Sequence, residues 1–162
     1  MKRIAGIALC LIVALCLLTG CKDNFPEGKT LVFDDLQLTL PGDFINLSEE
    51  AYARDADLLY GRNTLIVKGM EEKKADLQVT TLEQYTALII AGNKLTCTPE
   101  VYGKGYLFSY ETPVGDTKYT YVTATFESAG SFWVFQFYCP SENVKENQPE
   151  IDIILSGIRV NY

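Results

Sequence analysis

The 162-residue sequence contains no histidine, and this absence excludes more chemistry than any other feature of its composition. It rules out catalytic arrangements that pair histidine with serine or cysteine, and it removes the commonest protein ligand for zinc and copper. No Ser-x-x-Lys occurs, so a serine–lysine acyl-transfer site has no support. Gly103-Lys104-Gly105 lacks the spacing of a dinucleotide or phosphate loop. We therefore predict no catalytic residue, no metal and no cofactor.

Positive charge is also scarce, with 14 lysines and arginines against 21 acidic residues and a net charge of −7. Removal of residues 1–20 would take away two basic residues and no acid, which gives −9. An acidic surface repels phosphate backbones and anionic lipid headgroups. We therefore expect neither nucleic-acid binding nor a basic surface that holds the protein on a membrane.

The N-terminus has the layout of a secretory signal peptide, with Met1-Lys2-Arg3 followed by the apolar run Ile4–Leu18. This run is shorter than the about 20 residues that a permanent membrane-spanning helix needs. It ends in Leu18-Thr19-Gly20-Cys21, which resembles the bacterial lipobox, whose cysteine is acylated and becomes the first residue. The alternative is an ordinary signal peptide with a chance cysteine. We predict a lipid on Cys21, which supplies the membrane attachment.

The remaining chain is long enough for one domain with a core. We predict a signal peptide at 1–20, the lipidated cysteine and a polar tether at 21–30, and a single domain at 31–162. The protein would be exported and lipid-anchored on the outer face of the bacterial cell membrane, or on the periplasmic face of an envelope membrane.

The first half of the domain has strand-like patterns. Leucines alternate with polar residues over 36–40, the period of a half-buried strand. Two shorter strands are predicted over Asp57–Tyr60 and Thr64–Lys68, and the mixed charges of Glu71–Lys74 predict a solvated loop. Threonine and glutamine at the ends of Thr81–Gln84 form a capping box, which predicts a helix over 81–91.

The second half reads as a meander and a closing helix. Three strand-like runs, Val101–Glu111, Lys118–Glu127 and Ser131–Cys139, are joined by turn residues. Apolar residues then recur at helical spacing up to Gly157, and Ser141 and Pro149 both suit a helix N-terminus. This order predicts an α+β domain, with helices packed on a largely antiparallel sheet.

Three features of the domain resemble PsbP-like domains, named after an extrinsic subunit of photosystem II. They are Leu38-Thr39-Leu40-Pro41-Gly42-Asp43-Phe44, the tyrosine- and phenylalanine-rich meander, and the run from Cys139-Pro140-Ser141 to Ile154-Leu155-Ser156-Gly157-Ile158. The resemblance covers about residues 31–160. It implies a sandwich in which a largely antiparallel sheet of about six strands is flanked by helices on both faces, and a non-catalytic binding or assembly role. Metal-binding residues of photosynthetic members do not transfer, because this chain has no histidine.

Two cysteines, Cys97 and Cys139, remain in the domain, and export would permit a disulfide. In a meander the first and third strands run in the same direction. Cys97 precedes the first strand and Cys139 ends the third, so the two would lie about 25 Å apart at opposite ends of the sheet. A disulfide needs Cα atoms within about 7 Å. We therefore predict two free thiols.

Carboxylates remain as candidate acid–base groups, and Asp55 and Asp57 lack the spacing of a calcium loop. Solvated surface is our main interpretation of these charges, although two of them could meet in a cleft. The candidates are Asp34, Asp35, Glu49, Glu50, Asp55, Asp57, Glu71 and Glu72.

Tyrosine is concentrated in the meander, where both faces of the strands carry large apolar groups. The main interpretation is that both sheet faces are covered. In the alternative, part of a tyrosine face is open, where rings with hydroxyls suit sugar or protein contacts. The candidate binding surface is then Tyr106, Tyr110, Tyr119 and Tyr121.

These observations favour a lipid-anchored extracytoplasmic domain of non-enzymatic binding or assembly type, whose partner is an envelope protein or a glycan. The alternative is a small envelope hydrolase or glycan-active enzyme that uses paired carboxylates. Solute capture for a transporter is disfavoured, since such proteins usually close two lobes around a cleft.

Overall fold

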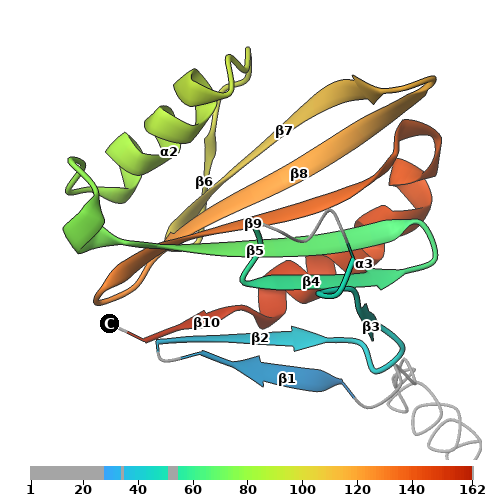
Figure 1. The fold of residues 1–162 in the computed structure, drawn as a ribbon, viewed down its shortest axis with the longest axis horizontal. Helices are drawn as coiled ribbons and strands as arrows, with labels where there is room; N and C mark the ends of the chain where they lie inside the picture. Colours follow the sequence, from blue (N-terminus) through green and yellow to red (C-terminus); the bar gives the residue numbers. More distant parts are fainter. Residues whose placement is uncertain (1–27, 34, 51–54, 162) are drawn as a thin grey trace, which may run out of the picture.

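The computed structural model describes residues 28–33, 35–50 and 55–161, so the predicted signal peptide and Cys21 lie outside the described residues. Two antiparallel sheets and two α-helices make up the described part (Figure 1). The larger sheet has, in spatial order, β3 (Ile45–Asn46), β4 (Leu58–Arg62), β5 (Leu65–Lys73), β9 (Ser131–Pro140), β8 (Thr117–Glu127), β7 (Gly105–Val114) and β6 (Glu100–Tyr102). The smaller has β1 (Lys29–Val32), β2 (Leu36–Leu40) and β10 (Arg159–Val160). The helices are α2 (Leu82–Gly92) and α3 (Val144–Gly157).

The smaller sheet packs with α3 against one face of the larger sheet. Leu36, Leu38 and Leu40 are fully buried there, while the residues between them are exposed, so the predicted alternation in this strand is confirmed. They belong to the same core cluster as Trp133 of β9 and Ile154 of α3. β1 begins inside the predicted 21–30 tether, because Lys29 pairs with Leu40.

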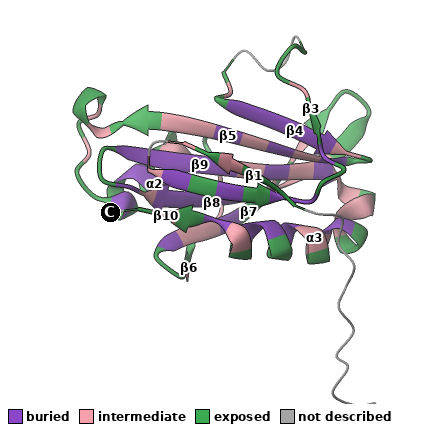
Figure 2. Ribbon diagram, turned by 90° about the horizontal axis from the view of Figure 1, so that it is seen from below, coloured by how far each residue is buried: buried purple, intermediate pink, exposed green. Residues whose placement is uncertain are grey.

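β9 lies at the centre of the fold and is buried along most of its length (Figure 2). Trp133, Phe135 and Phe137 point into the cluster shared with α3 and the smaller sheet. Phe132 and Val134, which alternate with them, point to the other face, where α2 packs. A strand with apolar residues on both faces is typical of a sheet that is covered on both sides.

α2 begins where the capping box predicts. Thr81 is its N-cap, and its hydroxyl accepts a hydrogen bond from the Gln84 backbone N–H at 3.2 Å. The Gln84 side chain accepts in turn from the backbone N–H of Thr80, one residue before the usual position, at 3.1 Å.

The closing helix differs from the prediction at its start. A 3₁₀ turn over Ser141–Asn143 leads into α3, so Pro149 lies inside the helix and not at its N-terminus. The Asn147 side chain donates to Thr64 Oγ1 at 3.1 Å, which ties α3 to the β4–β5 hairpin. None of the described helices is long and apolar enough to span a membrane.

The predicted strand Val101–Glu111 is wrong, because Gly103 breaks it. Gly103 has a φ of +59°, a conformation that favours glycine, and with Lys104 it forms the turn between β6 and β7. The Tyr102 side chain consequently packs in the cluster on the α3 side, and not on the face that carries Tyr106.

The predicted loop over Glu71–Lys74 is also wrong for its first three residues. Glu71, Glu72 and Lys73 continue β5 and pair with Trp133, Phe132 and Ser131 of β9. Their charge suggested a loop, but pairing with a buried central strand decides the backbone conformation here.

The predicted α+β class with a largely antiparallel sheet is confirmed. The prediction of one sheet of about six strands is wrong. The large sheet has seven strands, because the unpredicted β3 and the β6 created by the Gly103 turn join five predicted strands. The sixth predicted strand, β2, lies in a separate three-stranded sheet with β1 and β10.

Candidate functional site

α2 does not cover the whole of its face of the large sheet. The Tyr85 ring stacks on Phe132 with centroids 4.6 Å apart, and the hydroxyls of Thr86 and Thr125 are hydrogen-bonded at 2.7 Å. All these contacts lie toward the β8–β9 hairpin. Figure 1 shows β7 and β8 extending well beyond the helix in the other direction. The far half of this face is the candidate site.

Three tyrosines form a stack across the far half of this face, which we call the tyrosine row: Tyr110, Tyr121 and Tyr138. They are register partners on β7, β8 and β9. The Tyr110 and Tyr121 rings have centroids 4.9 Å apart and are nearly parallel, and those of Tyr121 and Tyr138 are 5.0 Å apart. Both faces of the Tyr121 ring are therefore covered by its neighbours. The row presents ring edges and hydroxyls to a ligand.

The hydroxyls of Tyr110 and Tyr121 stay protonated at neutral pH. Burial, together with the neighbouring Tyr121, raises the pKa of Tyr110 above its ordinary value. Burial and Tyr119 likewise raise the pKa of Tyr121. The Gln136 side chain donates a hydrogen bond to Tyr110 Oη at 3.1 Å, which fixes the orientation of that hydroxyl. These groups are neutral hydrogen-bond donors rather than acids or nucleophiles.

A groove of about 640 Å³ lies between the row and the end of α2. One wall is the chain that follows the helix, Asn93–Cys97, and the other is the β7 segment Ser109–Thr112. Glu111 is the one carboxylate in its lining, and it forms an ion pair with Lys118 at 2.5 Å. Hydrogen bonding to Lys118 lowers the pKa of Glu111. The groove is lined mainly by uncharged polar groups.

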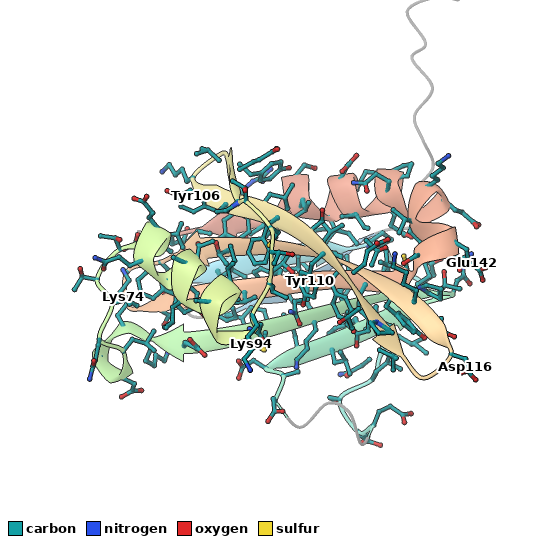
Figure 3. The ribbon with its side chains drawn as sticks, turned by 90° about the horizontal axis from the view of Figure 1, so that it is seen from above. Lys74, Lys94, Tyr106, Tyr110, Asp116 and Glu142 are labelled. Atoms are coloured by element: carbon teal, nitrogen blue, oxygen red, sulfur yellow. The ribbon has the colours of Figure 1, made fainter. Side chains whose placement is uncertain are left out.

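The four predicted tyrosines do not lie together in the structure. Tyr110 and Tyr121 stand next to each other in the row, and Tyr119 lies one position further along the same face of β8. Tyr106 packs instead against the cluster under α2 (Figure 3). The sequence reasoning missed Tyr138, although a turn centred on Ala129-Gly130 would have placed it opposite Tyr121.

The two cysteines are both free, as predicted, but the reason given for this is wrong. Cys97 does not lie at the far end of the sheet from Cys139. It lines the groove beside Tyr110 and Thr120, and Thr120 is the register partner of Cys139. Cys139 is buried, and burial raises the pKa of its thiol. Gly103 reverses the chain before β7, and this turn brings the segment that contains Cys97 alongside β7.

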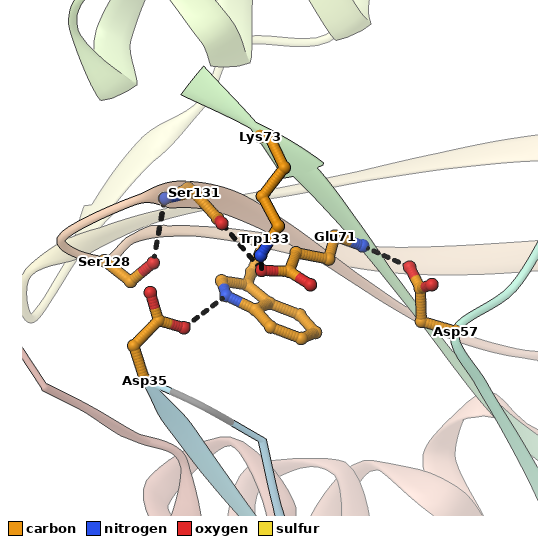
Figure 4. Close-up of polar contacts among 7 residues, drawn as sticks. All are labelled: Asp35, Asp57, Glu71, Lys73, Ser128, Ser131 and Trp133. Carbon is orange, nitrogen blue, oxygen red and sulfur yellow. Dashed lines mark hydrogen bonds and ion pairs between the residues drawn. The ribbon is translucent and has the colours of Figure 1, made fainter. Parts of the chain in front are cut away.

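Three of the candidate carboxylates accept hydrogen bonds within the fold (Figure 4). Asp35 Oδ1 accepts from the Trp133 indole at 3.3 Å, and Asp57 Oδ2 accepts from the backbone N–H of Glu71 at 2.5 Å. Glu71 itself accepts from Ser131 Oγ at 2.6 Å. No cluster of three or more acidic or cysteine side chains suited to a metal occurs in the described ranges. Of the other candidates, Glu49, Glu50, Asp55 and Glu72 are exposed, and Asp34 lies outside the described residues.

Comparison with known proteins identifies a fold but not a family. No protein-family model and no curated protein matches this sequence. Among solved structures, cyanobacterial PsbP (CyanoP) from Synechocystis superposes with a TM-score of 0.55 at 10% identity, covering 89% of this chain and 99% of CyanoP. The chain therefore has a PsbP-like fold. The resemblance seen in the sequence is confirmed at that level.

Two further structures share this fold. A Bacteroides thetaiotaomicron protein has a TM-score of 0.57 at 11% identity over 84% of this chain, which spans about half (49%) of that protein. LpqN, involved in cell envelope biogenesis of Mycobacterium tuberculosis, has a TM-score of 0.50 at 14% identity, with 85% and 92% of the two chains covered. At these identities the similarity establishes the architecture alone.

Proposed function

We propose that this protein is a non-enzymatic binding domain, exported and held at the membrane by a lipid on Cys21, which contacts an envelope protein through the tyrosine row. The observation that carries the proposal is the row itself. Three stacked rings lie across the strands on the part of the sheet face that extends beyond α2 (Figure 1). Tyrosine combines apolar area with a hydrogen-bonding hydroxyl, which suits it to protein interfaces.

The stacking geometry favours a protein over a glycan. Sugar binding by aromatic residues uses an open ring face, against which the apolar face of a sugar ring packs. The faces of Tyr121 are occupied by Tyr110 and Tyr138, so the centre of the row offers edges and hydroxyls only. The groove contributes one ion-paired carboxylate, Glu111, which gives no support to the alternative of paired-carboxylate catalysis.

Two other observations agree with an envelope role. The Leu18-Thr19-Gly20-Cys21 sequence predicts export and acylation. LpqN, which shares the fold, is involved in cell envelope biogenesis. The acidic composition leaves the lipid as the attachment to the membrane.

The test is affinity recovery of envelope proteins from the source organism with the full-length chain and two variants. Tyr110→Phe/Tyr121→Phe/Tyr138→Phe removes the hydroxyls and keeps the stacked rings. We expect this triple variant to recover the partner at least about tenfold less well, since each lost hydrogen bond weakens binding by about 0.5–1.5 kcal/mol.

Tyr102→Phe is the matched control, because Tyr102 packs on the opposite side of the sheet. It should recover the partner as well as the wild-type chain does. Equal recovery by the triple variant would show that the row is not the binding surface.

A further inference from the structure

β7 has an open edge along its second half. β6 pairs with β7 only from Tyr102–Gly105 to Glu100–Leu107. Continuation of this register would place Thr98 opposite Ser109 and Thr96 opposite Glu111. The chain instead leaves the sheet before Glu100, and the groove occupies the place where the next pairs would form.

The backbone of this edge is arranged to accept another strand. In an antiparallel ladder, every second residue directs both its N–H and its C=O to the same side. The two-residue hairpin loops at Gly103-Lys104 and Gly115-Asp116 set this phase, so Ser109 and Glu111 point away from β8. Pro113 has the same phase, and a proline within a strand is tolerated where its nitrogen faces an open edge. On the side that faces away from β8, the described residues provide no strand partner for Ser109 or Glu111.

The side chains near this edge also favour an added strand as the ligand. Tyr110 is the last ring of the tyrosine row, and it lines the groove. A residue of an added strand directly opposite Tyr110 would continue the row by one more cross-strand pair. Its neighbours in the added strand would lie opposite Ser109 and Glu111, where a basic side chain would share the Glu111 carboxylate with Lys118.

We propose that this groove binds an extended segment of a partner protein as an additional antiparallel strand, with an aromatic residue against Tyr110 and a basic residue opposite Glu111. This deepens the proposed function, because it names the form in which a protein partner is recognised. An alternating row of N–H and C=O groups is matched by a polypeptide backbone.

A second copy of the chain is a poorer occupant of this edge. Two-fold pairing of two β7 edges around Glu111 would place the two Glu111 carboxylates directly opposite each other, and pairing around Tyr110 would make them diagonal neighbours on one face. Like charges across strands are destabilising. The Asn93–Cys97 wall also stands where the sheet of a second copy would have to continue.

The probe is the fluorescein-labelled peptide Thr-Lys-Tyr-Lys-Thr-amide, titrated with the full-length chain in detergent and followed by fluorescence anisotropy. With tyrosine opposite Tyr110, both lysines exchange backbone hydrogen bonds with Ser109 and Glu111, while the tyrosine N–H points away. We expect N-methylation of both lysines to weaken binding about tenfold or more. N-methylation of the tyrosine alone is the matched control, and it should change the affinity less than about twofold.

The same groups are tested from the protein side. Ser109→Pro removes one edge N–H and leaves the β8 side of the strand paired, as Pro113 already does, whereas Ser109→Ala keeps the N–H. We expect the proline variant alone to lose affinity for the peptide. Equal binding of both methylated peptides, or full binding by Ser109→Pro, would overturn strand addition.

Three further outcomes distinguish strand addition by a partner from pairing with a second copy and from the proposed function on which it rests. A dimer in sedimentation equilibrium that Ser109→Pro abolishes would assign the edge to a second copy and overturn the partner segment. Loss of partner recovery in the triple phenylalanine variant, without discrimination between the methylated peptides, would overturn strand addition and leave the tyrosine row as the binding surface. If the chain discriminates between the methylated peptides but no partner is recovered, strand addition is supported and the tyrosine row loses its support as the partner-binding surface.

Discussion

The indole Nε1 of Trp133 donates a hydrogen bond to Asp35 Oδ1 at 3.3 Å and so connects the larger sheet to the loop between β1 and β2 (Figure 4). Trp133 is almost completely buried, in the middle of the core cluster. Asp35 precedes β2 directly, and its backbone carbonyl also accepts from the Asn161 N–H at 2.8 Å. One residue therefore anchors the smaller sheet to the core and to the C-terminal strand.

Replacement of Asp35 by alanine should destabilise the fold, because it leaves the buried Trp133 N–H without its acceptor. We expect a loss of about 1–3 kcal/mol in the free energy of unfolding. Trp133 is the only tryptophan, so urea unfolding followed by its fluorescence reports on this site directly. Asp35→Asn keeps an acceptor oxygen and should lose less. An equal loss in both variants would show that the carboxylate charge, not the hydrogen bond, is what matters.

Gly105 is a glycine because β7 passes too close to the chain of β8. A Cβ at this position would lie 2.4 Å from the Thr125 carbonyl oxygen and 2.8 Å from the Phe126 ring. Gly105→Ala should destabilise the protein by about 1–3 kcal/mol, measured by thermal or urea unfolding. Gly92→Ala is the control, since no atom lies within 4 Å of its added Cβ. At the last residue of α2, alanine should raise stability by up to about 1 kcal/mol.

Alkaline pH should unfold the protein through its buried tyrosines. Burial raises the pKa of Tyr85, Tyr110 and Tyr121 in the folded state, and the neighbouring Glu72 raises that of Tyr85 further. Their contribution to stability is complete below the unfolded value of about 10 and is lost as pH rises toward the folded pKa, because the unfolded chain then releases protons more easily. Stability measured across pH 9 to 12 should therefore fall with pH.

Tyr85→Phe should reduce this alkaline loss without harming the protein at neutral pH. The Tyr85 hydroxyl is buried near the Glu72 carboxylate, but at a geometry too poor for a hydrogen bond with it or with any other described residue. Its removal should leave the free energy of unfolding unchanged or raise it by up to about 1 kcal/mol. A clear loss of stability at pH 7 would mean that this hydroxyl is paired in solution.

The two thiols of the domain should differ strongly in reactivity. Cys97 is half-exposed at the groove, whereas Cys139 is buried and burial raises the pKa of its thiol. Since the thiolate is the reactive form, a water-soluble maleimide should modify Cys97 within minutes and leave Cys139 intact until urea unfolds the chain. Peptide mapping by mass spectrometry distinguishes the two sites. The probe peptide should also slow the labelling of Cys97, which lines the groove.

Most features set by neighbouring residues were predicted well, with the turn at Gly103-Lys104 as the exception. The leucine alternation over 36–40, the cap of α2 at Thr81 and the hairpins of the meander depend on residues close together in the chain, whose periodicity and turn chemistry are visible in the sequence. The acylation of Cys21 also rests on a local motif, and it stays a prediction.

Features that depend on distant residues could not be read in this way. Glu71–Lys73 form a strand because the buried strand β9 pairs with them. The local charge pattern gives no information about this pairing. Tyr138 joins Tyr110 and Tyr121 only once three strands are in register.

The sequence by itself determined the apolar and polar faces of most elements, the class of the fold, and the absence of histidine-based chemistry. Tertiary structure alone decided which part of the tyrosine face α2 leaves open and where β7 has a free edge. The physical reason is that periodicity records which side of an element is apolar. Burial and strand pairing depend on contacts between segments that lie far apart in the chain.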